Sequence, residues 1–549
     1  MKTHTLTQCL GAVLIGAALQ AQAGNDKIGK TKVEGGVAAA NPRSGSPENV
    51  VADGFALNLI AQGSDPIENP SDVIQYFGYL ANGILTLPPL PPIDNPGVAN
   101  KTEPDENTYL ELDQNPGGPT EGYDYGRRFL FQGHENAGDL AFVTRINLDV
   151  TDPAHRITLL TPVGDDKKTH FNRIDGSVFN PFTQTLLFTQ ENGNAGGVIE
   201  IGLQWSTGVR TLYGILGQGG YEGIHPDNRG NLIIAEDVGG TSVPLDPTQP
   251  FDAVTNPKVP KNPNSFVYRF VPNDVTDLSS GGKLQALQVS IGGAAVKFVP
   301  IDATHPNGDV FSDNQLHLHT LGTSWPCRWV TIHDTDTDGT DAFDANKAAK
   351  NAGATPFKRP ENVAFLPGSG FNTFFFCPTG DTDARVGTQS GLVARGAWGS
   401  IFRVDFPGGV EEGSVSIVVL GDADHSSFDN LTFGSTGLLL ATEDRGDNLH
   451  KQLNKLDSIW TFDVRKPGAP AVRLVALGRD SASTVDSAYL EAGKKGFPND
   501  GDNEPTGLTV SGGGTRVQEL LGKPMNPNHA RAFFTQQHGL NRVFEITGD

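Results

Sequence analysis

Acidic residues stand at the head of several apolar runs in this chain of 549 residues. In each unit an acid opens an alternating apolar run that predicts a β-strand, and a turn leads to a second strand ending in another polar or acidic residue. Acids are poor strand formers, so their recurrence at this position indicates a chemical use. These strand-head acids are Asp175, Glu222, Glu361, Asp429 and Glu504.

Carboxylates gathered in one place suit a site for hard cations and an anionic substrate. Their oxygens are the usual ligands of Ca²⁺ and Mg²⁺ and also accept Mn and Fe. Arg359 could make a bidentate contact with phosphate oxygens, and His134 beside Glu135 is either a metal ligand or an ordinary surface histidine. The chain has no G-x-S-x-G elbow and no H-E-x-x-H motif.

The uneven spacing of the acid-headed units excludes a solenoid and favours propeller blades that carry insertions. With the strands between them, the units predict an all-β fold: a six-bladed β-propeller with long loop insertions and a few short helices. The innermost strands of a propeller line a central channel, so the acids would converge at one of its mouths. Any one acid taken alone could equally be a turn or cap residue that faces solvent.

The amino-terminal residues predict export. Lys2 and His4 precede a short apolar run, and Ala21-Gln22-Ala23 fits a small-x-small cleavage site. We therefore expect a secreted or periplasmic protein that uses the general secretory route. The expected organisation is a signal peptide over 1–23, a flexible leader over 24–60 and a single propeller domain over 61–549, of which 240–358 is largely insertion.

The net charge of the chain excludes some classes of binding partner. Lys and Arg number 41 against 63 Asp and Glu, which gives a net charge of −22. Such a field repels nucleic acid and anionic lipid, so we expect neither nucleic-acid binding nor membrane insertion. The expected partner is a small phosphorylated substrate, bound by a monomer. Once the signal peptide is removed, Cys327 and Cys377 remain, either as a disulfide or as buried thiols.

The stretch His333–Gly339 places carboxylates at alternate positions before a glycine, like the first half of a calcium loop. The twelfth position of that loop is Ala345, which cannot supply the bidentate glutamate of an EF-hand. A surface calcium site and a plain acidic turn both remain open here.

An ordered series of short motifs spans residues 125–549: Gly133-His134-Glu135, Thr189-Gln190-Glu191, Arg359-Pro360-Glu361, Asn503–Gly507 and Phe534–His538. Together they resemble the PhoX family of secreted alkaline phosphatases. The resemblance implies a six-bladed propeller with iron and calcium bound by carboxylates in the central channel. It makes Arg359 a phosphate contact. It also implies metal ligands at Glu191, Glu222, Glu361 and Glu504, with looser matches at Glu135 and Asp429.

The chain departs from the family pattern at two places. The family has an iron-binding Cys before a strand that ends in Thr-Cys-Glu-Glu. Here the corresponding stretches are Asn172-Arg173-Ile174-Asp175-Gly176 and Thr189-Gln190-Glu191-Asn192, so the Cys and one acid are missing. Calcium needs no thiolate, and we therefore expect calcium rather than iron.

We interpret the sequence as a secreted metal-dependent phosphoesterase, a phosphoric ester hydrolase that cleaves phosphate monoesters at a metal cluster in the channel. Arg359 and Glu361 are its expected catalytic residues. An alternative is a non-catalytic, calcium-bound propeller that serves as an extracellular binding module, and a lactonase-type propeller with one calcium is a third. Metal content together with an assay on p-nitrophenyl phosphate would separate them. The expected metal ligands are Glu135, Glu191, Glu222, Glu361, Asp429 and Glu504.

Overall fold

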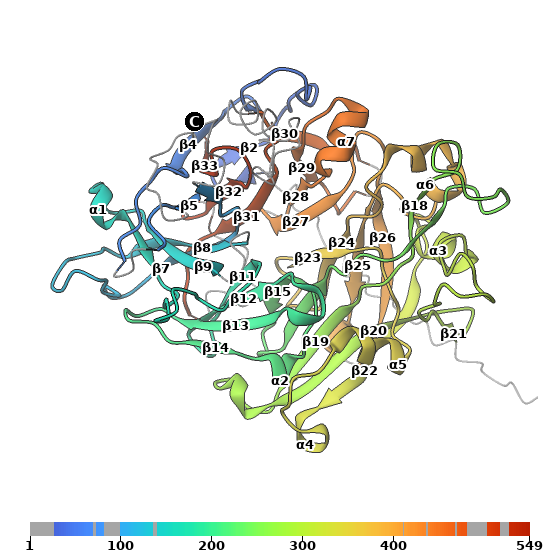
Figure 1. Cartoon of the computed structure of the whole chain (residues 1–549), viewed down its shortest axis with the longest axis horizontal. Helices are drawn as coiled ribbons and strands as arrows, with labels where there is room; N and C mark the ends of the chain where they lie inside the picture. Colours follow the sequence, from blue (N-terminus) through green and yellow to red (C-terminus); the bar gives the residue numbers. More distant parts are fainter. Residues whose placement is uncertain are drawn as a thin grey trace, which may run out of the picture.

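Strands make up most of the regular structure in the computed structural model of the chain (Figure 1). No helix in the described part of the chain is long and apolar enough to cross a lipid bilayer. The signal peptide expected over 1–23 lies outside the described residues. The structure describes residues 27–69, 73–81, 99–135, 140–409, 411–434, 437–466, 469–479, 502–516, 526 and 528–548.

Two sheets of four antiparallel strands come first along the chain. The first contains β7 (Pro104–Glu111), β8 (Arg128–His134), β9 (Phe142–Asn147) and β10 (Ile157–Leu159). The second contains β11 (Ile174–Asn180), β12 (Thr185–Gln190), β13 (Gly197–Gly202) and β14 (Val209–Thr211).

A ten-stranded sheet follows. One half contains β15 (Tyr221–Pro226), β16 (Leu232–Glu236), β19 (Val267–Pro272) and β20 (Gly282–Ile291), with β21 (Ala294–Ala295) paired to β20. The other half contains β23 (Pro360–Phe365), β24 (Thr373–Pro378), β25 (Ser400–Asp405) and β26 (Glu412–Leu420). The strand β22 (Trp325–Asp334) lies between β20 and β26 and pairs with both.

Two further sheets combine strands from both ends of the chain. One contains β27 (Phe428–Phe433), β28 (Leu439–Glu443), β29 (Ser458–Phe462), β30 (Val472–Ala476) and β3 (Val50–Val51). The other contains β31 (Pro505–Ser511), β32 (Arg531–Gln536), β33 (Arg542–Gly548) and β4 (Phe55–Ala61). β3 pairs with β30 and β4 pairs with β33. Each therefore covers a sheet edge whose backbone groups would otherwise be unpaired.

Six strands contact one another in a closed order: β7, β11, β15, β23, β27, β31 and back to β7. These six, called the ring strands below, are the terminal strands of the five large sheets, and the ten-stranded sheet supplies both β15 and β23. Figure 1 shows β11, β15, β23, β27 and β31 gathered near the middle of the molecule, with the later strands of their sheets farther out. The fold is therefore all-β and propeller-like, as predicted.

Six separate blades are not confirmed. The strand β22 pairs with β20 through residues 327–334 and with β26 through residues 325–328, so the third group of strands and the fourth form one continuous sheet. This pairing satisfies the open edges of both β20 and β26, which is the physical reason that no boundary lies between them.

The structure corrects part of the expected leader. Residues 24–60 were expected to be flexible, but β3 and most of β4 lie within them as outer strands of two sheets. Phe55 and Ala52 are buried in the apolar core of these sheets, which a composition rich in small residues did not indicate. The expected insertion over 240–358 also contributes strands to a sheet, since β19, β20 and β22 belong to the ten-stranded sheet.

The remaining elements are short, and the expectation of a few short helices is confirmed. Three two-stranded sheets are β1 (Lys27–Ile28) with β2 (Thr31–Lys32), β5 (Tyr79–Ala81) with β6 (Ala99–Lys101), and β17 (Ser242–Pro244) with β18 (Lys258–Lys261). The helices are α1 (Pro153–Arg156), α2 (Tyr213–Leu216), α3 (Asp313–Leu318), α4 (Thr335–Asp338), α5 (Ala345–Ala352), α6 (Ser390–Val393) and α7 (Gly446–Leu453).

The apolar core lies between neighbouring sheets. Phe131 of β8 and Phe188 of β12 belong to one buried cluster, and Leu187 of β12 and Ile234 of β16 belong to the next. Each strand thus presents alternate side chains to the two sheets beside it. This packing holds the ring strands in fixed positions relative to one another, and so positions the residues at their heads.

Candidate metal centre

Every ring strand has an interruption of its register at or near its head. The pairing with the second strand shifts after Pro104, Ile174, Tyr221, Pro360, Phe428 and Thr506. In five of the six strands the first residue inside the interruption is acidic. A bulge of this kind turns a side chain away from the regular strand alternation, which places an acid where a strand would not normally present one. The five acids are Asp105, Asp175, Glu222, Glu361 and Asp429.

The small residue after the acid lets adjacent ring strands approach closely. A Cβ atom on Gly176 would lie 2.2 Å from the carbonyl oxygen of Glu222 on the next ring strand. A Cβ atom on Gly223 would lie 2.6 Å from the Cα atom of Asn362 on the strand after that. Glycine is therefore required at both positions, and the strand-head acids of neighbouring strands are brought close together.

The second strands supply more acids at the same level. Glu135 follows β8, Glu191 follows β12, Asp237 follows β16 and Asp444 follows β28. The amide-bearing Gln537 takes the corresponding place after β32 and donates hydrogen bonds to Asp105 (2.7 Å) and Glu135 (2.9 Å). One end of the ring is therefore lined by carboxylates from both the first and the second strands.

Two groups of three acids are close enough to hold a cation. The first is Asp175, Glu191 and Glu222, and the second is Glu222, Asp237 and Glu361; within each, one ligand atom per residue lies within 4.8 Å of the others. Because Glu222 belongs to both, the two groups form one cluster. The carboxylate cluster, as it is called below, consists of Asp175, Glu191, Glu222, Asp237 and Glu361.

The structure thus brings together Glu191, Glu222 and Glu361 among the expected ligands, and leaves the other three outside these two groups. Glu135 contacts Gln537 and an arginine, and Glu504 faces His538 at 3.6 Å. Burial raises the pKa of Asp429, and the neighbouring Glu361 and Asp105 raise it further. These three acids lie outside the carboxylate cluster, although Glu135 acts electrostatically on Glu191 and Asp429 on Glu222.

Burial and mutual repulsion make the carboxylate cluster costly without a cation. Burial raises the pKa of Glu222 well above its usual value, and the neighbouring Asp175 and Glu361 raise it further. Burial and Asp237 raise the pKa of Glu361 to about 8, although Arg359 and Thr379 act in the opposite direction. Acids in this state either keep their protons or gain a positive partner.

Unsatisfied oxygens show where such a partner fits. The Oδ1 atoms of Asp175 and Asp237 are buried and accept no hydrogen bond from any described residue. Buried carboxylate oxygens without partners are rare in native structures, and an all-oxygen set of this kind matches the ligands of Ca²⁺ or Mg²⁺. In the described residues Cys327 and Cys377 are free and buried, and the Sγ atom of Cys377 donates a hydrogen bond to the carbonyl oxygen of Asp429 at 2.7 Å. The residues therefore fit a hard cation.

Two arginines lie beside these acids. The Nε atom of Arg359 donates to Asp237 at 2.7 Å, and its Nη2 atom is 3.5 Å from Glu361. The Nη1 atom of Arg173 is 3.3 Å from Glu135 and 3.5 Å from Glu191. Burial would lower the pKa of Arg359, but Asp237 and Glu361 raise it well above its usual value, so this guanidinium stays charged.

Comparison with known proteins finds one matching family. Residues 260–517 match the model of the family described as Alkaline phosphatase PhoX. This match covers a little under half of the chain and supports membership of the PhoX family. No curated protein sequence matches the chain.

Among solved structures, PhoX of Pseudomonas fluorescens in complex with vanadate, a transition state analogue, superposes with a TM-score of 0.51 at 12% identity, over 94% of this chain and 98% of that one. At this identity the likeness to PhoX shows a shared fold. A calcium structure of a Trichoderma reesei carbohydrate-active enzyme of family AA12 (TM-score 0.30, 11% identity, 93% of this chain and 99% of that one) is a weaker match.

Sequence reasoning missed two members of the carboxylate cluster and one neighbour. Asp175 is among the predicted strand-head acids but not among the predicted metal ligands, and Asp237, which directly follows the strand end at Glu236, is in neither group. Asp105 opens the bulge of β7, where Asp105-Glu106-Asn107 precedes the apolar pair Tyr109-Leu110. The same acid-headed pattern that marks the other ring strands could have found it.

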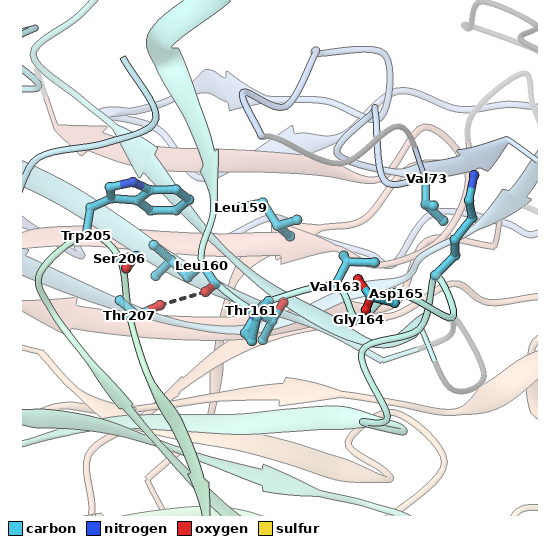
Figure 2. Close-up of a pocket in the computed structure, with 12 residues that line it drawn as sticks. Val73, Leu159, Leu160, Thr161, Val163, Gly164, Asp165, Trp205, Ser206 and Thr207 are labelled. Carbon is cyan, nitrogen blue, oxygen red and sulfur yellow. Dashed lines mark hydrogen bonds between the residues drawn. The ribbon is translucent and has the colours of Figure 1, made fainter. Parts of the chain in front are cut away.

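Other candidate sites are accounted for differently. In the outer loop, Asp334 caps α4 and Asp338 accepts from the backbone of Asp334 at 2.9 Å, so these carboxylates serve an acidic turn. Within the described ranges this loop is not among the groups of acids and histidines close enough to hold a metal. A cavity of about 480 Å³ lined by Leu160, Trp205, Thr207 and neighbouring residues contains no member of the carboxylate cluster (Figure 2).

Proposed function

We propose that the chain is a metal-dependent phosphoesterase that hydrolyses phosphate monoesters at the carboxylate cluster. The observation that carries this proposal is the position of Glu222 in two acid groups at once, beside two buried carboxylate oxygens without partners and next to the charged Arg359. Such a site binds cations and an anion together, which is what a phosphate ester requires. The match to the PhoX family model supports the same reaction class.

Asp175, Glu191 and Glu222 would hold one cation, and Glu222, Asp237 and Glu361 a second. A cation bound there would neutralise charge on the phosphoryl group and lower the pKa of a water molecule. Calcium is favoured over iron because the donors are carboxylate oxygens and no thiolate or imidazole belongs to either group.

Arg359 would orient the phosphoryl group. Its Nε and Nη2 atoms are engaged by Asp237 and Glu361, so the plane of the guanidinium is fixed while other N–H groups remain for phosphate oxygens. Its side chain is only 17% exposed, and a contact in such a site is screened little by water. Glu361 holds this orientation, and Thr379 donates a hydrogen bond to Glu361 in turn.

The wider organisation belongs to the same proposal. We regard the ten-stranded sheet as two blades merged through β22, which makes six blades around the ring. We also expect secretion through the signal peptide over 1–23, and action as a monomer on small soluble esters. Because the net charge of −22 repels an anionic substrate overall, attraction of the substrate would depend on the arginines near the carboxylate cluster.

The test is hydrolysis of p-nitrophenyl phosphate by the purified mature chain. Activity should fall when a chelator removes calcium and return when calcium is restored. Absence of turnover at saturating calcium, in a protein that still binds the ion, would favour the extracellular binding module instead.

A further inference from the structure

Arg173 and Arg359 occupy the same place in two different sheets. Each stands two residues before a strand-head acid, Asp175 in one case and Glu361 in the other, and each has a left-handed backbone, with φ of 47° and 57°. Each guanidinium contacts the acid that follows the second strand of the preceding group: Arg173 reaches Glu135 after β8, and Arg359 reaches Asp237 after β16. The two positions are therefore structurally equivalent.

The two arginines differ in exposure, 52% for Arg173 against 17% for Arg359, and in the acids that they join. Arg173 lies between two acids that come from second strands, since Nη1 is 3.3 Å from the Oε1 atom of Glu135 and 3.5 Å from the Oε2 atom of Glu191. One positive group thus links two carboxylates that would otherwise repel each other. Gln537 donates to the other oxygen of Glu135 at 2.9 Å, so both oxygens of that carboxylate have partners.

The acids on the other side of Glu191 have no such partner. Asp175 and Glu222 make no ion pair with any described lysine or arginine, and one oxygen of Asp175 is buried without a hydrogen bond. The positive charge of Arg173 therefore ends at Glu191, and Arg359 reaches the carboxylate cluster only from the other side, at Asp237 and Glu361. The carboxylate of Glu191 has two oxygens, so one can face Arg173 while the other serves the carboxylate cluster.

We propose that Arg173 is a fixed cation that takes the place of a metal ion between Glu135 and Glu191, and so confines exchangeable metal to the carboxylate cluster around Glu222. This inference rests on the metal site of the proposed function. A guanidinium cannot be removed by a chelator and does not lose its proton in proteins. The Glu135 side of the ring therefore stays neutralised in the metal-free protein.

The test compares the calcium content of three variants with that of the wild type, by mass spectrometry after saturation with calcium chloride and desalting. Arg173→Gln should bind one further calcium ion per chain, because the freed carboxylates repel each other until a cation joins them. Arg173→Lys keeps the charge and should bind the same number as the wild type. Arg128→Gln is the matched control, because Arg128 also forms an ion pair with an acid and its side chain has nearly the same exposure as that of Arg173 (51% against 52%). Arg128 begins β8, whereas Glu135 follows the last residue of that strand.

A second readout is thermal unfolding in excess chelator, which does not depend on activity. Arg173→Gln should unfold at a lower temperature than the wild type in chelator and regain the difference in calcium chloride. If Arg173→Gln does not fold, the double variant Arg173→Gln/Glu135→Gln, which removes both charges of the pair, should fold and bind the wild-type number of ions.

Unchanged or reduced calcium content in Arg173→Gln would overturn the inference, as would a gain of calcium in Arg173→Lys. These outcomes are separate from the proposed function. A wild-type protein that binds calcium but is inactive would contradict the proposed phosphoesterase function. The role of Arg173 would then still be decided by the number of calcium ions bound per chain.

Discussion

Glu222 and Glu361 lie on adjacent ring strands, and each offers a carboxylate oxygen within 4.8 Å of the other. Both acids are buried, and Glu361 helps to raise the pKa of Glu222. Two such groups side by side are stable as anions only if positive charge lies between them. The close approach of β15 and β23 at Gly223 maintains the arrangement, so the fold itself creates the demand for a cation.

Removal of metal should destabilise the protein. A ligand that binds only the folded state adds about 2.7 kcal/mol to the free energy of unfolding when its concentration is 100 times its Kd. We expect the melting midpoint to rise on addition of calcium chloride to the chelated protein, and magnesium to have a smaller effect because it demands stricter octahedral geometry. Equal midpoints with chelator and with calcium would show that the carboxylate cluster does not bind the ion.

Replacement of Glu222 by Gln should reduce calcium content more than replacement of any other single acid of the carboxylate cluster. The reason is that Glu222 belongs to both acid groups, whereas Asp175 or Glu361 belongs to one. Calcium content of Glu222→Gln, Glu361→Gln and the outer-loop control Asp336→Asn, measured on desalted protein, checks this. Loss of calcium in Asp336→Asn with retention in Glu222→Gln would move the metal site to the outer loop.

Replacement of Arg359 by Lys should lower kcat/KM for p-nitrophenyl phosphate about 100-fold, which is typical for loss of one transition-state donor. Lysine keeps the charge but lacks the planar fork that contacts Asp237 and a phosphoryl group at the same time. Calcium content should be retained. Arg385→Lys, which alters a similar ion pair with Asp383 on another part of the surface, should keep wild-type kinetics. If both variants keep full activity, Arg359 does not bind the substrate.

The network around His450 should make stability depend on pH. Burial alone would lower the pKa of His450, but ion pairs with Asp457 (2.8 Å) and Asp502 (3.5 Å) raise it from 6.5 to about 10. Because the pKa of His450 is higher in the folded than in the unfolded state, its ion pairs add their full contribution to the free energy of unfolding below the unfolded-state pKa. This contribution is lost as the pH rises toward the folded-state pKa of about 10. Arg43 and Arg479 also pair with Asp502, so the network is balanced without a metal ion.

The substitution His450→Gln should therefore cost about 3–5 kcal/mol near pH 6, the usual effect of removing one partner from a buried ion pair, and much less near pH 10. Unfolding in denaturant at the two pH values measures the difference. An equal cost at both would mean that His450 acts as a neutral residue, for example as a ligand with Asp447 and Asp502.

The sequence predicted those parts of the site that depend on local pattern. Glu222, Glu361 and Asp429 each precede an apolar strand within a few residues, so the strand-head position was visible without a structure. The acid-small-residue pair was visible too, and the structure explains it by the contact between Gly223 and the strand that carries Asn362.

The contacts and strand pairings that the sequence did not predict join residues far apart in the chain. The contact of Arg173 with Glu135 joins residues 38 positions apart, and the pairing of β4 with β33 joins the two ends of the chain. No local pattern predicts which sheet edge a distant strand will cover. The same reason explains why β22, read as part of an insertion, merges two groups of strands into one sheet.

The most direct test is a crystal structure of the mature protein in calcium chloride and orthovanadate, whose vanadium atom becomes five-coordinate and so mimics the transition state of phosphoryl transfer. We predict a cation bonded to Glu222 together with oxygens of Asp175 or Asp237, and vanadate within hydrogen-bond distance of Arg359. Cations confined to the outer loop near Asp336, with the carboxylate cluster empty and no vanadate at Arg359, would contradict the account.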